Sequence, residues 1–213
     1  LAVIASLGKP VLIATGAASS DDVHRAMDLL LASGVDIVLM QCNTNYTGSI
    51  ENAHHANLRV IQQYAREYPQ VTLGLSDHTP GHVTVLGAVA LGARVVEKHF
   101  TDDTGRVGPD HGFSMDPVTW RAMVDDTRLL EAALGDGVKR VEDNEQQTVV
   151  LQRRCVRTAR DLPAGHVVTR DDLVVLRPAP REAFAAHEVD AVVGRTLGRA
   201  LVAGEQVGPA DLA

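Results

Sequence analysis

The chain has 213 residues, with 20 Lys and Arg against 27 Asp and Glu, which gives a formal net charge of −7. This acidic balance argues against a nucleic-acid-binding protein, which normally presents a basic patch. Only 3% of the residues are aromatic, too few for base-stacking platforms, and no apolar run approaches the ~20 residues that cross a bilayer. The two cysteines, Cys42 and Cys155, form no spaced framework of the kind that disulfide-bonded proteins show, so we expect a cytoplasmic protein. The charge and the short apolar runs lead us to expect no nucleic-acid or membrane partner.

Residues 1–134 alternate between short apolar segments and longer segments with helical spacing. Four strands are predicted, at residues 11–15, 36–40, 71–75 and 94–97. A helix follows the first strand, capped near Ser19 and Ser20, and three more are expected over residues 50–68, 81–91 and 116–134. Such alternation is typical of a parallel α/β sheet buried on both faces, either half of an eight-unit barrel or most of a doubly wound sheet.

The carboxyl-terminal part differs in character. Residues 135–152 are polar and rich in charge, which predicts a linker. Residues 153–213 contain an internal repeat, because LPAGHVVTRDDL at 162–173 aligns with LVAGEQVGPADL at 201–212. Each copy predicts a strand, a tight turn at Gly165 or Gly204, a short strand and a one-turn helix, so a small, mostly β domain is expected.

Polar side chains gather where each predicted strand ends, which is where ligands bind in parallel βα architectures. His78 and His99 end two consecutive strands, which lie about 4.8 Å apart in a sheet. Two imidazoles at one level can share a metal ion and leave positions open for substrate; the alternative is two hydrogen-bonded loop histidines. Asp77 and Glu97 are expected to orient them, whereas alternation turns Lys98 away, toward an outer salt bridge.

Three segments together resemble the sialic acid (N-acetylneuraminate) synthase family. They are GLSDHT at 74–79, VEKHFT at 96–101 and GPDHGFSMDP at 108–117. The segment from Lys9 to Gly16 and the SAF-type, antifreeze-like character of residues 153–213 agree with it. The resemblance implies the carboxyl-terminal half of a (β/α)8 TIM barrel over residues 1–134 and a small, mostly β SAF domain. It also implies condensation of phosphoenolpyruvate with N-acetylmannosamine to a nine-carbon sialic acid, with release of phosphate.

The same resemblance implies catalytic roles for His78 and His99, which would hold a divalent cation, usually Mn²⁺, with Mg²⁺ and Co²⁺ as the alternatives. Lys9, Asn45 and Ser76 would contact phosphoenolpyruvate. Spacing alone would not select Lys9, since it precedes the first strand at the wrong end for a site.

Sugar contacts are implied for Tyr46 and for Asp110, which would also act in catalysis. Arg177 would reach the active site of a partner subunit, which implies a domain-swapped homodimer. Two departures from the family pattern bear on these roles: the turn at 47–49 reads TGS where many members have PTP, and Arg177 is followed by PAPR instead of PGxG.

Two alternatives therefore stay open beside the sialic acid synthase. One is a synthase of a related acid, such as legionaminate, pseudaminate or N-acetylneuraminate 9-phosphate. The other is a non-catalytic carbohydrate-binding or assembly module. Because an eight-unit barrel takes ~250 residues and this chain supplies four units, we expect these residues to come from a longer chain and to be inactive alone.

Overall fold

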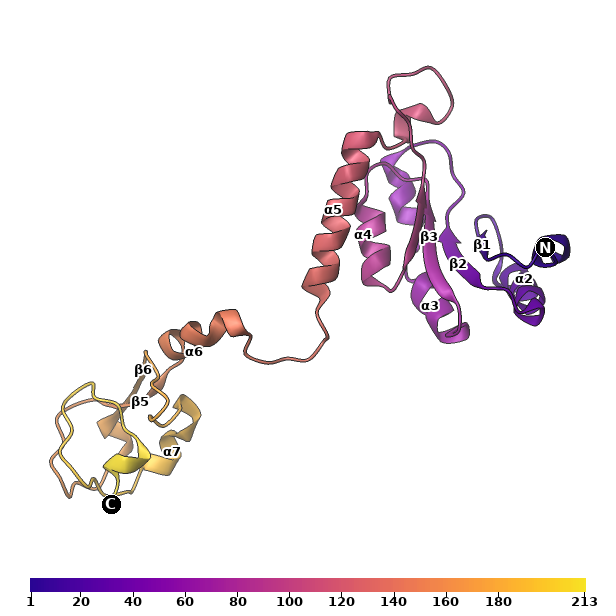
Figure 1. Cartoon of the computed structure of the whole chain (residues 1–213). Helices are drawn as coiled ribbons and strands as arrows, with labels where there is room; N and C mark the ends of the chain where they lie inside the picture. The colour runs from indigo at the N-terminus through magenta and orange to yellow at the C-terminus, as the bar shows by residue number, and fades with distance from the viewer. The chain divides into compact units, whose positions relative to one another are not determined.

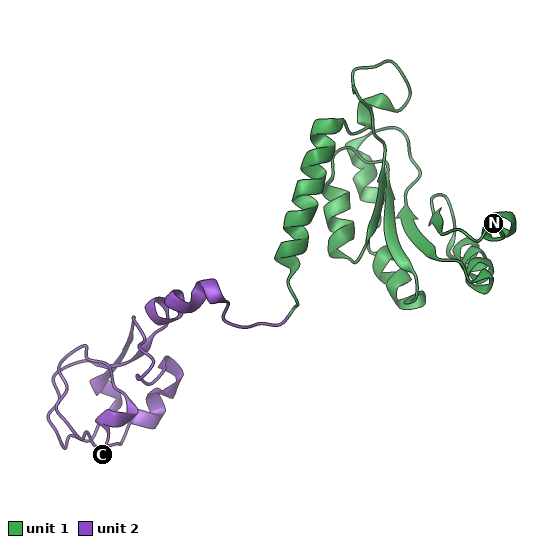
Figure 2. Ribbon diagram, viewed as in Figure 1, with its two compact units in different colours: residues 1–137 green, residues 138–213 purple.

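The computed structural model describes residues 1–213 and divides them into two compact units, Leu1–Gly137 (unit 1) and Val138–Ala213 (unit 2) (Figure 2). Unit 1 is built on one parallel sheet with strand order β1-β2-β3-β4. Its strands are β1 (Val11–Ala14), β2 (Ile37–Cys42), β3 (Thr72–Asp77) and β4 (Val95–Lys98). All four occupy the predicted apolar segments. Cys42 pairs in register with Ser76, and Asp77 with Lys98, so three carboxyl ends lie at one edge of the sheet.

Helices connect the strands of unit 1, and α4 and α5 lie side by side (Figure 1). Ser19 caps α2 through a capping box with Asp22, and Asp116 caps α5 in the same way ahead of Pro117. The helices of this unit are α1 (Ala2–Ala5), α2 (Ser20–Ser33), η1 (Ile50–His55), α3 (Val60–Glu67), α4 (Val83–Ala90), η2 (His111–Phe113) and α5 (Pro117–Leu134).

The continuous helix predicted over residues 50–68 is wrong, because the segment breaks between η1 and α3. Asn57 takes a left-handed backbone conformation with φ 42°. The side chain of Gln41 donates a hydrogen bond to the carbonyl oxygen of Ala56 at 3.0 Å. A tertiary bond from β2 therefore takes a carbonyl group that a continuous helix would have used.

The core of unit 1 lies between the helices and the sheet. Met27 and Leu30 of α2, Ile61 of α3 and Leu39 of β2 have no exposed surface. Burying side chains of this size contributes about 2 kcal/mol each. The buried residues of α2 thus lie on the face that packs on the sheet. No helix of the structure has the length and apolarity needed to span a membrane.

Unit 2 contains a two-stranded antiparallel sheet and the repeated turns. Its elements are η3 (Asp143–Glu145), α6 (Gln146–Gln152), β5 (Cys155–Thr158), η4 (Arg170–Asp172), β6 (Leu173–Leu176), η5 (Ala186–Glu188), α7 (Val189–Val192) and η6 (Pro209–Asp211). The segment predicted as a linker thus includes α6. Leu162 and Leu201, which open the two repeats, form a β-bridge with each other. Gly165 and Gly204 both have φ +80°, a conformation that favours glycine, and η4 and η6 are the predicted one-turn helices.

Each repeat also carries a buried aspartate that holds its own turn. Asp172 is fully buried and accepts hydrogen bonds from Arg160, from His166 and from the backbone and hydroxyl of Thr169. The bond from His166, followed by those from Thr169, lowers the pKa of this carboxyl far below its ordinary value. His166 is therefore part of this cluster.

Candidate active site

Three rings meet at the carboxyl edge of the sheet in unit 1. The ring centroids of His78, after β3, and His99, after β4, lie 5.1 Å apart. Tyr46, in the loop after β2, places its ring 4.5 Å from His78 and 5.6 Å from His99 in edge-to-face contacts. His78 is buried, whereas half of Tyr46 is exposed. The structure thus brings the two predicted histidines together beneath an aromatic rim.

The environment of His78 favours a neutral imidazole. Burial, followed by the proximity of His99, lowers the pKa of His78 below its ordinary value. Its Nδ1 atom lies 3.9 Å from Sγ of Cys42. Only the neutral ring has a lone pair for a metal ion, so this environment suits a ligand.

Asp110 reaches His99 from the loop that follows β4. Oδ2 of Asp110 lies 3.7 Å from Nδ1 of His99. The loop folds back because Met115 donates a backbone hydrogen bond to the carbonyl oxygen of His99 at 2.9 Å. Phe113, in the same loop, packs its ring 5.1 Å from the His99 ring. Asp110 therefore lies beside the histidine pair, where it can contact a ligand bound to that pair.

The donor set suits a metal ion that also binds water or substrate. The structure contains no group of three or more His, Cys, Asp or Glu side chains arranged to hold a metal. Two imidazoles alone leave most coordination positions open, unlike the four protein ligands of a closed structural site. The residues present fit a substrate-binding cation, and imidazole accepts several first-row metals.

Ser76 and Glu97 each precede one of the two histidines by two residues in the chain. They are paired in register, and the hydroxyl of Ser76 donates to Oε1 of Glu97 at 2.9 Å. Alternation along a strand puts Ser76 on the same face as His78, and Glu97 on the same face as His99. The expectation that Asp77 orients a histidine is wrong, because its carboxylate bonds to Lys98, Thr79 and Thr84 instead.

The remaining predicted residues have different surroundings. The amide oxygen of Asn45 accepts hydrogen bonds from the backbone and hydroxyl of Thr47, so it holds its own loop. Lys9 is exposed and precedes β1, at the edge of the sheet opposite to His78. Arg177 is exposed and follows β6 in unit 2. The structure does not bring Lys9 to the histidine pair.

Two neighbours of the histidines were not singled out from sequence. Phe113 packs on His99, and only its place in the segment 108–117 could have suggested this. Cys42 is buried and contacts His78 through its sulfur atom. Its position at the end of β2, in register with Ser76, was the available signal.

The fold and site define a half barrel of βα units that carries a histidine pair at its carboxyl edge. Residues 1–139 match the NeuB family and residues 153–213 match the SAF domain. The chain belongs to the NeuB family, which confirms the predicted fold class of half a TIM barrel with a SAF domain.

Named relatives support this assignment. The chain is 37% identical to N,N'-diacetyllegionaminic acid synthase of Legionella pneumophila, over 94% of this chain and 56% of that protein. It is 32% identical to N-acetylneuraminate-9-phosphate synthase of mouse, over 83% of this chain and 48% of that protein. The chain spans about half the length of the curated relatives it matches.

Solved structures agree with the same family. A spore coat polysaccharide biosynthesis protein E from Chromobacterium violaceum aligns with a TM-score of 0.69 at 29% identity, over 99% of this chain and 62% of that one. An N-acetylneuraminic acid synthetase from Leptospira borgpetersenii aligns with a TM-score of 0.62 at 30% identity, over 70% of this chain and 50% of that one.

Proposed function

We propose that this chain carries the metal-binding half of a synthase that condenses phosphoenolpyruvate with an N-acetylated mannose-type sugar, and that the sugar is N-acetylmannosamine. The reaction joins C3 of phosphoenolpyruvate to the aldehyde carbon of the sugar, which gains a proton on its oxygen. Water adds to C2, and cleavage of the bond between C2 and the phosphate oxygen releases inorganic phosphate and leaves the keto group. The observation that carries the proposal is the pair of imidazoles 5.1 Å apart at the carboxyl edge of the sheet. The names of the relatives, which are synthases of nine-carbon acidic sugars, support the reaction class.

His78 and His99 would hold a divalent cation, for which we propose Mn²⁺, with Mg²⁺ and Co²⁺ as the other candidates. When bound, the cation would polarise the aldehyde oxygen and stabilise the negative charge that develops there. The burial that lowers the pKa of His78 keeps its ring neutral and ready to bind. The carboxylate of Asp110 can accept hydrogen bonds from sugar hydroxyl groups beside His99.

Substrate contacts are proposed for four further residues. Ser76 and Asn45 would contact phosphoenolpyruvate, and Tyr46 would line the sugar site; Lys9, at the opposite edge of the sheet, is left out of this site. Arg177 of the partner subunit in a domain-swapped homodimer would reach the N-acetyl group. Ser76 has the strongest structural support, because its hydroxyl lies on the face of the histidine pair. Both cysteines are unpaired, and we propose the reducing cytoplasm as the location.

The experiment is a chimera in which residues 1–213 replace the matching segment of the Legionella relative, because the chain spans about half of that protein. We expect phosphate release that requires phosphoenolpyruvate, an N-acetylated hexosamine and Mn²⁺. His78→Ala and His99→Ala should abolish it, whereas His54→Ala, on an exposed histidine of η1, should not. A folded chimera without release, or one indifferent to both histidine substitutions, would refute the proposal.

A diacetylated sugar is the second candidate substrate. Gly48 has φ +65°, and a side chain there would collide with Phe113, so this turn is built differently from the PTP turn that many members of the resembled family have. The Legionella relative is itself named for diacetyllegionaminic acid. Competition among hexosamines in the chimera separates the candidates: preference for the diacetylated sugar would replace N-acetylmannosamine as the substrate.

A further inference from the structure

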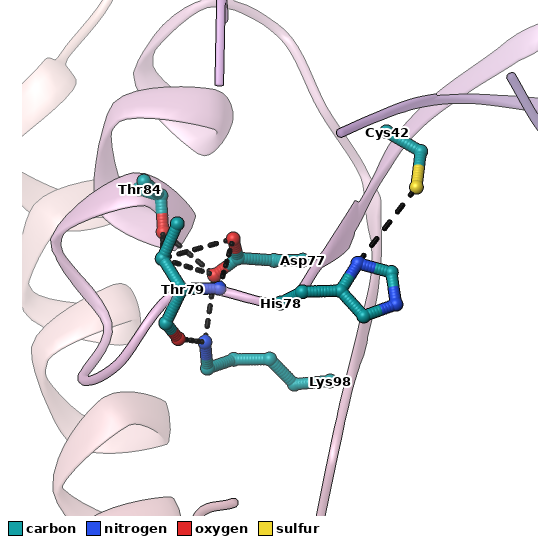
Figure 3. A network of polar contacts seen from close by, with 6 residues as sticks. All are labelled: Cys42, Asp77, His78, Thr79, Thr84 and Lys98. Atoms are coloured by element: carbon teal, nitrogen blue, oxygen red, sulfur yellow. Dashed lines mark hydrogen bonds and ion pairs between the residues drawn. The ribbon is translucent and has the colours of Figure 1, made fainter. Parts of the chain in front are cut away.

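A buried ion pair lies directly behind the histidine pair. Nζ of Lys98 donates to Oδ2 of Asp77 at 2.7 Å, and the two side chains are only 2% and 4% exposed. Figure 3 shows Asp77 pointing toward Lys98 and Thr84, and His78 pointing to the other side, toward Cys42. The charged pair therefore does not line the site itself.

Further hydrogen bonds complete this pair. Asp77 accepts from the backbone and hydroxyl of Thr79 and from the hydroxyl of Thr84 at 2.7 Å. Lys98 also donates to the carbonyl oxygen of Thr79 at 2.5 Å. The Asp77–Lys98 cluster, comprising these four residues, thus ties the end of β3, the loop after it and the start of α4 to the end of β4.

Register links this cluster to the histidines. Asp77 and Lys98 are paired in register, and each is the residue immediately before a histidine. Since successive side chains of a strand point to opposite faces, the ion pair and the two imidazoles lie on opposite faces of the same two strand ends. A link on one face therefore fixes how far apart the rings lie on the other.

Stability alone does not explain such a pair. Removing two charges from water costs several kcal/mol, and apolar residues of similar volume are often as stable or more so. A buried pair with specific geometry does define a single register between β3 and β4. A slip of one residue between β3 and β4 would move one histidine to the other face, and it would leave both charges buried without partners.

We propose that the Asp77–Lys98 cluster is a positioning device that holds His78 and His99 at the separation at which both can bind one cation. The inference rests on the proposed function, and it adds four positioning residues to that site. None of the four touches the cation or the substrate. Their effect is on the geometry of the two ligands.

The test compares wild type with the double variant Asp77→Leu/Lys98→Met, which replaces the ion pair by apolar side chains of similar size. Leu30→Ala, in the core of α2, is the control for lost stability, and Lys98→Arg keeps the charge. One readout is the Mn²⁺ dissociation constant of the chain, measured by electron paramagnetic resonance. The other is the nuclear Overhauser effect between the His78 and His99 rings in metal-free protein.

We expect the double variant to bind Mn²⁺ about tenfold more weakly and to lose the inter-ring Overhauser effect. Leu30→Ala should keep both, and Lys98→Arg should keep the Overhauser effect. If the double variant does not fold, Thr84→Val removes one donor to Asp77 and should weaken Mn²⁺ binding in the same direction.

Wild-type affinity or an unchanged Overhauser effect in a folded double variant, or wild-type affinity in Thr84→Val where that variant serves, would overturn the inference. If the single substitution His78→Ala leaves Mn²⁺ binding unchanged, the proposed metal site fails instead. The Overhauser effect measured in the double variant then decides by itself whether the cluster positions the rings.

Discussion

Replacing Asp172 by Asn is expected to destabilise unit 2 without changing its shape. The carboxylate is fully buried and accepts from five donor groups: two of Arg160, one of His166 and two of Thr169. An asparagine amide has one accepting oxygen and one donating nitrogen. The groups that donate to one carboxylate oxygen of Asp172 would therefore face the amide nitrogen, which is itself a donor. The guanidinium of Arg160, two thirds exposed, can turn to water and relieve part of this loss.

The size of the effect follows from the bonds that are lost. A hydrogen bond to a charged group contributes roughly 1.5–3 kcal/mol, and the relief at Arg160 puts the net cost at about 2 kcal/mol. In a unit of this size that corresponds to a fall of about 10 °C in melting temperature. The repeat supplies a matched control, because Asp211 accepts from only Arg199 and the backbone of Gly208. Asp211→Asn should cost about half as much.

The sign of the pH dependence is fixed by the lowered pKa of Asp172. A carboxyl with a lowered folded-state pKa stabilises the fold above its unfolded value of about 3.9, and this contribution is lost as the pH falls through the folded-state value. The difference in unfolding free energy between wild type and Asp172→Asn should therefore be constant near neutral pH and shrink below about pH 4.

Hydrogen exchange is the appropriate assay, since the single tryptophan and all three tyrosines lie in unit 1. The amides of Leu162 and Leu201, which bond across the repeat bridge, report on unit 2. We expect their protection to fall about thirtyfold in Asp172→Asn, which is what 2 kcal/mol corresponds to. Unchanged protection, or equal losses in Asp172→Asn and Asp211→Asn, would refute the reasoning.

Three further predictions concern unit 1. Gly74→Ala should lower the free energy of unfolding by about 2 kcal/mol, because its Cβ would lie 2.8 Å from a carbonyl oxygen of β4. Chemical denaturation followed by tryptophan fluorescence measures this, and Gly112→Ala, with open space around it, should leave the free energy of unfolding unchanged. The His78 ring of metal-free protein should gain its proton only below pH 6.5, because its pKa is lowered from that ordinary value; protonation at or above pH 6.5 in a nuclear magnetic resonance titration would contradict this. Tyr64→Phe removes the hydrogen bond to Thr15 and should cost about 1 kcal/mol in the same denaturation assay, and an unaltered midpoint would count against that bond.

The fold of unit 1 was largely predictable because its signals are local. Strand positions followed from apolar runs, α2 began after the predicted cap at Ser19, and α5 began within one residue of its expected start. The break between η1 and α3 was not predictable, because it depends on a hydrogen bond from Gln41 that only the folded chain brings near. Local propensity does not contain such contacts.

Part of the candidate site was predictable for the same reason. Parallel strands align their carboxyl ends, so two histidines that follow neighbouring strands had to lie close together, and His78 and His99 do. Alternation also placed Lys98 on the far side, in the outer salt bridge that was expected. Lys98 pairs with Asp77, which was instead expected to orient a histidine.

The sequence by itself determined which polar residues lie at the end of each strand, because periodicity and strand direction are local properties. Only the tertiary structure decided how the loop of residues 101–114 folds back to bring Asp110 and Phe113 against His99. It also decided that His166 lies in a buried cluster with Asp172. These contacts depend on where distant segments meet, and that is set by the packing of the whole unit.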